Sequence, residues 1–472
     1  MRTECLDGCK NAGVGTQAKV VPTGARHEVG VDELFFSTTD ARGIIDQANS
    51  VFVRLSRYSR DELVGAPHNL IRHPVMPGGA FLLMWDTIEA GQPFCAYVDN
   101  LAADGSTYGV FATITPLGDD YLSVRTRPFV DGLHDAAFSL YGAVRPMELE
   151  LQEKGWNPHE AAVVGAEKLG ELLVGAGIPS YEEFIWKALP AEVEACLEQS
   201  SGIAKRPLAT GDMAEMLGVA MRIDTALREW VHSLDDLQRV ADALLAAAPQ
   251  FSETMEANAR VADQINENDA EGFFSSAMVY LRVWAQMAPE VAGIVTELLV
   301  QLDELRRSCA QTRFRIALAV LHNFTVGQFV VEIIDNVPGS EEARPAIGQL
   351  GRALDEGLAS ASEGTQHNAA LAAAAADRIS TLRDLLDLPQ TMIREWLSRA
   401  DRSSSTFMEM VDTISAQVDR TQADIDLLGS LSDECRRIAV PLDSSVVEIE
   451  TQKLRSLMES HQAHRPRYAL AK

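Results

Sequence analysis

The feature that most constrains this chain is an apolar seam of long, regular spacing in its C-terminal half. Apolar residues recur every three or four positions from Met216 to Met255, which is the a/d pattern of a helix that packs along another helix. A second seam runs from Phe407 to Cys435, with Thr421 and Ser432 as polar interruptions. The two seams predict a long helical hairpin or bundle.

Two breaks interrupt this helical pattern. Pro249 lies inside the first seam and has no backbone N–H, so we expect the helix to kink or restart there. Between the seams, the turn-like segment NVPGSEEARP at 336–345 predicts a reversal of the chain. The periodicity fits a monomeric bundle and a dimeric coiled coil equally well. We favour a homodimer or higher oligomer, because a rod of this kind generally needs a partner helix.

Residues 31–130 have a different pattern. Short β-rich runs, LFFSTTD, IIDQAN, PFCAYVDNLA, TYGVFATITPL and DYLSVRTRP, alternate with turn signals such as Asp104-Gly105. Between the second and third runs lie the helix-like segments NSVFVRLS, RDELVG and AFLLMWDTIEAG. This order predicts a small antiparallel sheet with helices packed on one face.

The remaining segments complete the predicted organisation. We expect a flexible leader at 1–30, a linker with a small helical segment at 131–208, a helical transmitter or bundle at 209–460 and a tail at 461–472. Cys5 and Cys9 in the leader form a lone C-x3-C, which we interpret as two ordinary thiols rather than a metal site.

Composition excludes several classes of partner. The chain has 41 Lys and Arg against 68 Asp and Glu, a net charge of −27, so it has no cationic surplus for nucleic acid. No apolar run reaches the roughly 20 residues of a membrane span, and the N-terminus lacks the apolar core of a signal peptide. We therefore expect a cytoplasmic protein. Without a P-loop, Gly-x-Ser-x-Gly or paired-carboxylate motif, we predict no enzyme, no catalytic residue and no metal site.

The connector PHNLIRHPVMP at 67–77 is unusually polar and is bounded by prolines. Together with TTD-x-x-G, N-x-x-F, Y-S-x-x-E-L-x-G and G-x-P-aromatic in the same order, it resembles the PAS domain of bacterial aerotaxis receptors over about 95 residues. The resemblance implies an α+β PAS domain, a five-stranded antiparallel sheet with flanking helices, followed here by a long all-α coiled-coil or bundle region. It also implies a pocket that holds FAD noncovalently and reports redox state.

The resemblance implies particular cofactor-binding residues. A flavin offers carbonyls and ring nitrogens that need donors, and FAD adds two phosphates. Arg72 would supply a fixed guanidinium fork and His73 a group that donates or accepts, while His68 and Asn69 would hold the connector through backbone hydrogen bonds. The full set comprises Asn49, His68, Asn69, Arg72, His73, Trp85 and Phe94. Haem is disfavoured, because only an axial histidine, His73 or His68, speaks for it.

The chain departs from the family pattern at three positions. Val75 replaces an aspartate, Phe94 replaces a tryptophan, and Gly109 replaces the tryptophan of Y-W-V. The helical half resembles a chemoreceptor signalling region only weakly, at FRIALAVLHNFTVGQFVVE. Two hypotheses follow. One is a redox or oxygen sensor that signals to a chemotaxis coupling protein or histidine kinase. The other is a scaffold whose ligand-free PAS domain mediates dimerisation or assembly.

Overall fold

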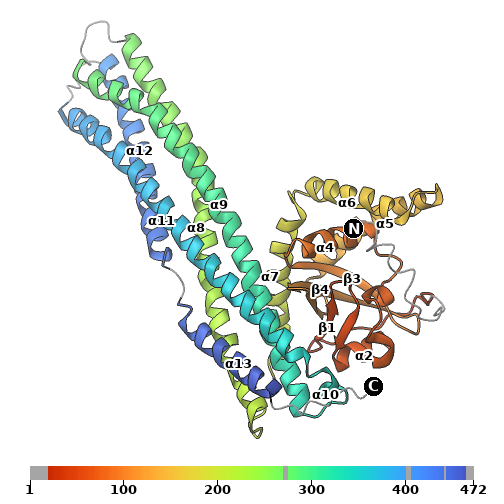
Figure 1. Cartoon of the computed structure of the whole chain (residues 1–472). Helices are drawn as coiled ribbons and strands as arrows, with labels where there is room; N and C mark the ends of the chain where they lie inside the picture. The colour runs from red at the N-terminus through yellow and green to blue at the C-terminus, as the bar shows by residue number, and fades with distance from the viewer. Residues whose placement is uncertain (1–19, 269–274, 400–404, 441–442, 464–472) are drawn as a thin grey trace. The chain divides into compact units, whose positions relative to one another are not determined.

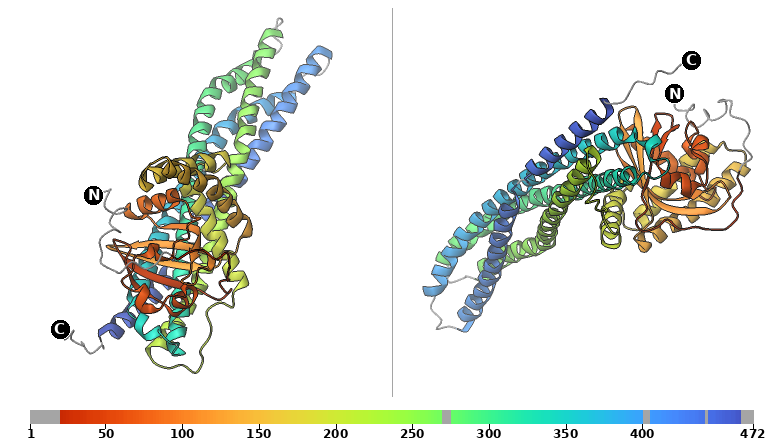
Figure 2. Two further views of the ribbon diagram at one scale, coloured as in Figure 1. Left: turned by 90° about the vertical axis from the view of Figure 1, so that its right-hand side faces the viewer. Right: turned by 90° about the horizontal axis from the view of Figure 1, so that it is seen from below.

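The computed structural model describes residues 20–268, 275–399, 405–440 and 443–463. Cys5 and Cys9 lie outside these residues. The chain divides into two compact units: the first comprises the described residues up to 229 with 313–361 and 444–463, and the second comprises 230–312 and 362–443. Figure 1 labels the elements and Figure 2 gives two further views.

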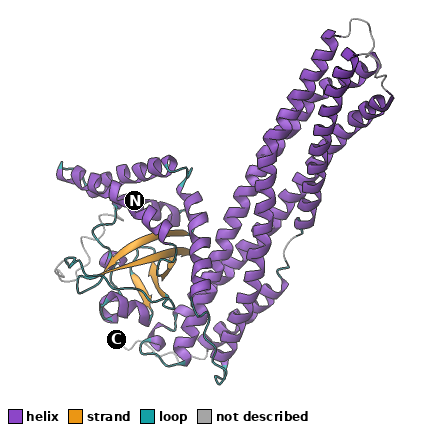
Figure 3. Cartoon of the chain, turned by 180° about the vertical axis from the view of Figure 1, so that it is seen from behind, coloured by secondary structure: helices purple, strands orange, loops and turns teal. Residues whose placement is uncertain are grey.

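The first unit is built on one antiparallel sheet of five strands in the order β2-β1-β5-β4-β3. Figure 3 shows the strands in orange among the helices. Turns close at the predicted positions, and Gly43 and Gly105 adopt positive φ there, as tight hairpins require. The expected five-stranded sheet is thus confirmed. Its strands are Phe35–Asp40 (β1), Ile45–Ala48 (β2), Phe94–Leu101 (β3), Thr107–Leu117 (β4) and Asp120–Thr126 (β5).

The helices between β2 and β3 begin and end where local signals place them. Asn49 caps the first of them by accepting a hydrogen bond from the Phe52 N–H, and a capping box at Ser59 and Glu62 opens the second. The four helices are α2 (Ser50–Ser56), α3 (Arg60–Leu63), the 3-10 helix η2 (His68–Ile71) and α4 (Gly78–Glu89). After β5 come α5 (Asp131–Glu153), α6 (Pro158–Gly175) and α7 (Tyr181–Gln199).

Residues 20–30, which we expected in the flexible leader, make specific contacts with the sheet domain. The Thr23 N–H donates to the Gly105 carbonyl at 2.8 Å, and Arg26 forms an ion pair with Asp99 at 2.8 Å. The two His27 ring nitrogens lie 3.0 Å from the Ser106 hydroxyl and the Leu55 carbonyl. These contacts extend the folded domain upstream of the expected start at residue 31.

Later segments of the chain cover the face of the sheet that lies opposite α2 and α4. Phe36 of β1 packs edge-on against Phe329, and the Thr115 hydroxyl of β4 lies 3.2 Å from His322 Nε2. Both faces of the sheet are therefore buried, which explains the continuous burial of β1. The segments come from α9 (Ser275–Ile334) and α11 (Ala346–Arg399), and the predicted reversal between them is confirmed. The unit also contains α10 (Ser340–Ala343), α13 (Ser445–Ala463) and the start of α8 (Asp212–Asn268).

The second unit is a bundle of four helical segments, from α8, α9, α11 and α12 (Ser405–Ile438). Within this unit they run side by side in every view (Figures 1 and 2). Its core combines aliphatic residues such as Leu302 and Leu382 with a polar layer, in which Gln417 donates to Asn258 at 2.7 Å. The expected bundle is confirmed. The possible helix restart at Pro249 is wrong, because α8 continues through it; neighbouring helices can hold a helix that lacks one backbone bond.

α9 contains a strongly apolar segment that is mostly buried. The segment Glu290–Ile334 is long and apolar enough to cross a membrane by length and composition, but 89% of its most apolar window is buried inside the protein. A buried core helix passes the same test.

The free cysteines among the described residues, Cys95, Cys196, Cys309 and Cys435, are all buried.

Candidate ligand cavity

A cavity of about 190 Å³ lies between the inner face of the sheet, η2 and α4. Alternate residues of β3, β4 and β5 line it, as the period of two in a strand requires. They are Phe94, Ala96, Val98 and Asn100 of β3, Ala112 and Ile114 of β4, and Tyr121, Ser123 and Arg125 of β5. The cavity is smaller than the roughly 300–1,000 Å³ of sites that bury whole drug-sized ligands, so it would enclose the ring system of a larger ligand rather than the whole ligand.

The structure brings most of the predicted site residues to this cavity and leaves two outside. His68, Asn69, Arg72, Trp85 and Phe94 line it. Asn49 and His73 are not among its lining residues. The connector with η2 brings His68, Asn69 and Arg72 to the cavity, whereas Trp85 comes from α4 and Phe94 from β3.

Asn49 has all of its hydrogen-bonding capacity engaged elsewhere. Its Oδ1 accepts from the backbone N–H groups of Phe36 and Phe52, and its Nδ2 donates to the Leu34 carbonyl and, at 3.2 Å, to Glu332 of α9. An asparagine side chain offers two donors and one accepting oxygen. Asn49 therefore fixes the start of α2 and joins it to α9.

His73 stabilises the connector locally. Its Nδ1 accepts from the Val75 N–H at 3.1 Å, and burial lowers the pKa of its ring below the ordinary value. This bond closes a tight turn before α4, which begins after Pro77.

Arg72 enters the cavity wall with few polar partners. Its guanidinium lies 3.9 Å from the centre of the Phe81 ring and donates to the Met76 carbonyl over 3.4 Å, while its backbone bridges to Asn100 of β3. Burial lowers the pKa of Arg72 to about 10, which still leaves it cationic at neutral pH. Ring contact of this kind is a cation–π interaction, which does not neutralise the charge.

Arg125, which was not among the site residues predicted from the sequence, is the most deeply buried cation of the cavity. Its Nη2 lies 2.8 Å from His68 Nε2 and its Nη1 donates to the Ser37 hydroxyl at 3.3 Å. Burial lowers the pKa of Arg125 to about 10, and burial beside this cation lowers the pKa of His68 well below its usual value. His68 is therefore neutral and accepts the hydrogen bond through Nε2.

Asn100 is a second lining residue that was not predicted from the sequence. It is 3% exposed, lines the cavity, and its Nδ2 has no hydrogen-bond partner. A buried donor without an acceptor costs about 1–3 kcal/mol, so the cavity is prepared for an acceptor. The signal that could have found Asn100 is strand alternation, since Asn100 shares the inward face of β3 with the apolar residues Phe94, Ala96 and Val98.

Two aromatic residues close the apolar part of the cavity. Trp85 of α4 meets Tyr121 edge-on at 5.8 Å between ring centres, and a Cβ added at Gly43 would lie 3.2 Å from its indole. Phe94 is 3% exposed and stacks on Tyr181 of α7 at 5.1 Å. These rings form an aromatic, apolar part of the cavity wall.

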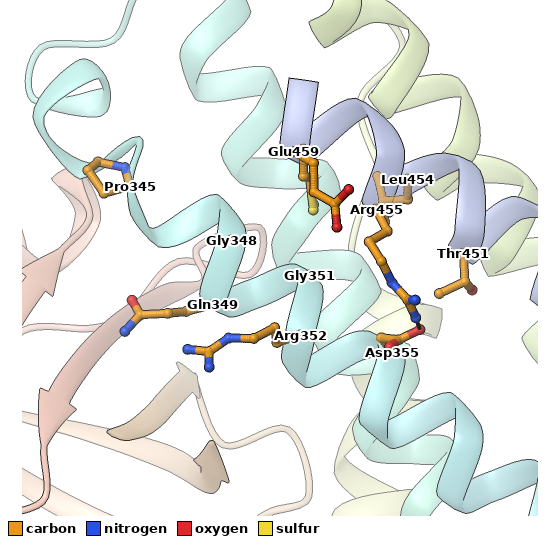
Figure 4. Close-up of a pocket in the computed structure, with 11 residues that line it drawn as sticks. Pro345, Gly348, Gln349, Gly351, Arg352, Asp355, Thr451, Leu454, Arg455 and Glu459 are labelled. Atoms are coloured by element: carbon orange, nitrogen blue, oxygen red, sulfur yellow. Dashed lines mark ion pairs between the residues drawn. The ribbon is translucent and has the colours of Figure 1, made fainter. Parts of the chain in front are cut away.

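A second, larger cavity of about 400 Å³ is a groove between α11 and α13 of the same unit, shown in Figure 4. Arg455 of α13 forms an ion pair with Asp355 of α11, and Arg352 lies 3.8 Å from Asp120 of β5. None of its lining residues carries an unpartnered buried polar atom among the described residues. Its charges are thus already compensated within the chain.

Comparison with known proteins finds relatives that match part of this chain. The chain is 42% identical over 101 residues to the aerotaxis receptor of Escherichia coli (strain K12), covering 20% of each chain. It is 36% identical over 81 residues to the nitrogen fixation regulatory protein of Klebsiella pneumoniae, covering 17% of this chain and 16% of that protein. The chain therefore spans about a fifth of the length of these relatives or less.

Solved structures align with only part of this chain, at low sequence identity and low TM-score. A variant of Vivid aligns with 26% of this chain and 96% of its own at 14% identity, with a TM-score of 0.18. A variant of RsLOV aligns with 30% of this chain and 89% of its own at 16% identity, with a TM-score of 0.20. No family model matches. From the strand order, the connector and the receptor match, the first unit contains a PAS domain that resembles the PAS domain of aerotaxis receptors.

Proposed function

We propose that this chain is a cytoplasmic signal-transduction protein that senses redox state or oxygen through FAD in the PAS cavity. The donor set carries this proposal: the guanidinium groups of Arg72 and Arg125 and the unpaired amide of Asn100 line one small cavity. The carbonyl oxygens and nitrogens of a flavin ring are acceptors that fit this set. When bound, the flavin supplies reversible electron exchange that changes the charge of the ring.

The cavity residues would make different kinds of contact with the bound ligand. Arg72 would hold the ligand with a charge-assisted hydrogen bond, and His68 and Asn69 would position the connector that carries it. Trp85 and Phe94 would stack against the ring and exclude water. Asn49 and His73 would act on the fold rather than on the ligand, because their side chains bond elsewhere.

Two contacts give the signal a physical route within the first unit. Glu148 of α5 accepts from the backbone N–H groups of Gly78 and Gly79, at 2.7 and 2.8 Å, so α5 caps the helix that walls the cavity. Glu332 of α9 accepts from Asn49 and Ser50 at the start of α2. Movement of α4 or α2 on a change in ligand charge would thus reach α5 and α9.

We further propose that the helical region acts as a homodimer or higher oligomer and passes the signal to a chemotaxis coupling protein or a histidine kinase. The alternative scaffold would dimerise through a ligand-free PAS domain. Its sheet face is not free for that purpose, since Phe329 packs on Phe36 and His322 meets Thr115. The sensor is therefore the better supported function. Light scattering of the purified protein would measure the oligomeric state.

The test is flavin binding by the full chain. We expect a yellow protein with flavin absorption, or an apo-protein that takes up added FAD. Arg72→Ala should weaken FAD affinity about ten- to a hundredfold, because a hydrogen bond from a charged donor contributes about 1.5–3 kcal/mol. His73→Ala is the matched control: it lies on the same connector but outside the lining, so its affinity should stay close to the parent's.

Three results would contradict the proposal. A parent protein that takes up no FAD favours the scaffold. An Arg72→Ala protein with parental affinity places Arg72 outside the ligand contacts. A lower melting temperature of apo Arg72→Ala, with affinity unchanged, assigns the connector to the fold.

A further inference from the structure

The cavity has a charge opposite to that of the whole protein. The chain carries 68 acidic against 41 basic residues. The lining of the cavity nevertheless contains three arginines, Arg42, Arg72 and Arg125, and, among the described residues, no aspartate or glutamate. Arg42 has its own partner, Asp40 at 2.8 Å. The cations without an acidic partner in the lining are therefore Arg72 and Arg125.

Arg125 is the extreme case because every group around it is neutral. It is 5% exposed and appears in no ion pair among the described residues. Its polar partners are the Ser37 hydroxyl and the neutral His68 ring, and its guanidinium carbon lies 5.6 and 5.7 Å from the ring centres of Phe35 and Phe52. Burying a charge without a counter-ion is costly. An anion in the cavity would offset that cost.

Asn100 points to the same kind of ligand independently of charge. Its unpartnered N–H group requires an acceptor at the cavity wall, and an anionic oxygen or nitrogen is a stronger acceptor than a neutral one. Arg125 and Asn100 sit on β5 and β3, whose alternate side chains share the inward face of the sheet. Both residues line the same cavity, so a ligand that fills it would meet a cation and an amide donor.

We propose that Arg125 makes this cavity selective for the anionic state of its ligand, so that a bound flavin is held more tightly in its reduced, negatively charged form than in its neutral, oxidised form. This inference rests on the proposed function and assigns to Arg125 the control of the midpoint reduction potential of the bound flavin. Uptake of two electrons and one proton at neutral pH leaves the ring with one negative charge. Tighter binding of that form raises the midpoint potential of the bound flavin above that of free flavin.

The experiment compares the FAD-loaded full chain with Arg125→Met, Arg125→Lys and the control Arg127→Met. Arg127 lies two residues further along the chain, against Phe129 and outside the lining. Dithionite titration with a reference dye gives the midpoint potential. We expect Arg125→Met to lose about tenfold or more of the preference for reduced flavin, which for a two-electron couple is a fall of about 30 mV or more. Arg125→Lys should retain part of the preference, and Arg127→Met all of it.

A ligand-independent readout separates a binding role from a folding role. Because Met removes an uncompensated buried charge, apo Arg125→Met should melt at or above the parental temperature. A lower melting temperature together with a parental midpoint potential would make Arg125 structural and overturn the inference. Parental potential in a stable, flavin-loaded Arg125→Met overturns this inference alone. A parent chain that binds no FAD overturns the proposed function and the inference with it.

Discussion

At the scale of single residues, the approach of α4 to α6 depends on glycines that leave no room for a side chain. A Cβ at Gly79 would lie 2.3 Å from the Ala166 nitrogen, and one at Gly165 would lie 2.1 Å from a Glu148 oxygen. The missing side chains let the buried Glu148 carboxylate reach the N–H groups at the start of α4, with Arg145 at 3.0 Å as its cationic partner. The pair Gly78-Gly79 in the sequence thus marks a close helix contact.

Gly79→Ala should destabilise the first unit by about 1–3 kcal/mol, because the added methyl must displace the α6 backbone. Gly170→Ala is the matched control on α6, where nothing lies within 4 Å of the added Cβ; there the change should be neutral or stabilising by up to about 1 kcal/mol. Urea unfolding followed by circular dichroism measures both. Equal stability of the two variants would refute the close contact.

Trp85 gives a second prediction at this scale. Its indole lines the cavity and is held edge-on by Tyr121, so Trp85→Phe should preserve the fold and the thermal stability of the apo-protein within about 1.5 kcal/mol. In the FAD-loaded protein the fluorescence of the flavin should rise, because an indole close to the ring quenches it. Unchanged flavin fluorescence would mean that Trp85 is plain core.

At the scale of elements, α9 docks on the start of α2 through a mostly buried carboxylate. Glu332 accepts from the Ser50 hydroxyl at 2.8 Å and from Asn49 at 3.2 Å, and burial raises the pKa of this carboxyl group. Phe329, one turn earlier on the same helix, packs on β1. A helix far along the chain is therefore registered against the PAS domain by one polar and one aromatic contact.

A double-mutant cycle measures the interaction free energy between Ser50 and Glu332. Ser50→Ala and Glu332→Gln should each destabilise the protein, and their combined effect should fall short of the sum by about 0.5–3 kcal/mol. Glu341→Gln in α10 is the control, since that carboxylate pairs with Arg344 instead; combined with Ser50→Ala it should be additive. Additivity of the Ser50 and Glu332 changes would show that the hydrogen bond has no energetic weight.

The sequence predicted elements better than it predicted contacts between them. Caps, glycines and alternation are local, so α2, α4 and the hairpin at Asp104-Gly105 could be located from their own residues. Asn49 was assigned to a cofactor because its partner Glu332 is 283 residues away and cannot be inferred from local pattern. Arg125 was overlooked for a similar reason: a cation on a strand normally faces solvent, and only the assembled sheet shows it facing inward.

At the scale of the whole molecule, the buried histidines make stability depend on pH. His322 lies against Thr115, and burial lowers its pKa from 6.5 to about 4. Below pH 6.5 the unfolded chain binds a proton that the folded chain does not, so folding becomes less favourable as pH falls from 6.5 to about 4. Above pH 6.5 both states are neutral at this position and the dependence on pH disappears.

His322→Gln should remove this contribution, which amounts to about 3 kcal/mol over the whole window. Melting temperatures between pH 4 and 8 would be compared for parent and variant, so that titrations common to both cancel. The gap between the two curves should change with pH below 6.5 and stay constant above it. Parallel parent and His322→Gln curves would show that the ring is accessible to protons.

Each of the two units contains buried cysteines whose reaction with an alkylating reagent would measure how often that unit opens. Cys95 and Cys196 belong to the first unit, and Cys309 and Cys435 to the second. Burial raises the pKa of Cys196 and Cys309 to about 12 and that of Cys435 to about 11, and a protonated, enclosed thiol does not react. In a chain with Cys5 and Cys9 replaced by serine, the rate at which an alkylating reagent modifies each thiol would therefore report how often its own surroundings open. Mass spectrometry of the alkylated peptides would measure the modification rate of each cysteine, and thus the opening rates of the two units separately in a single sample.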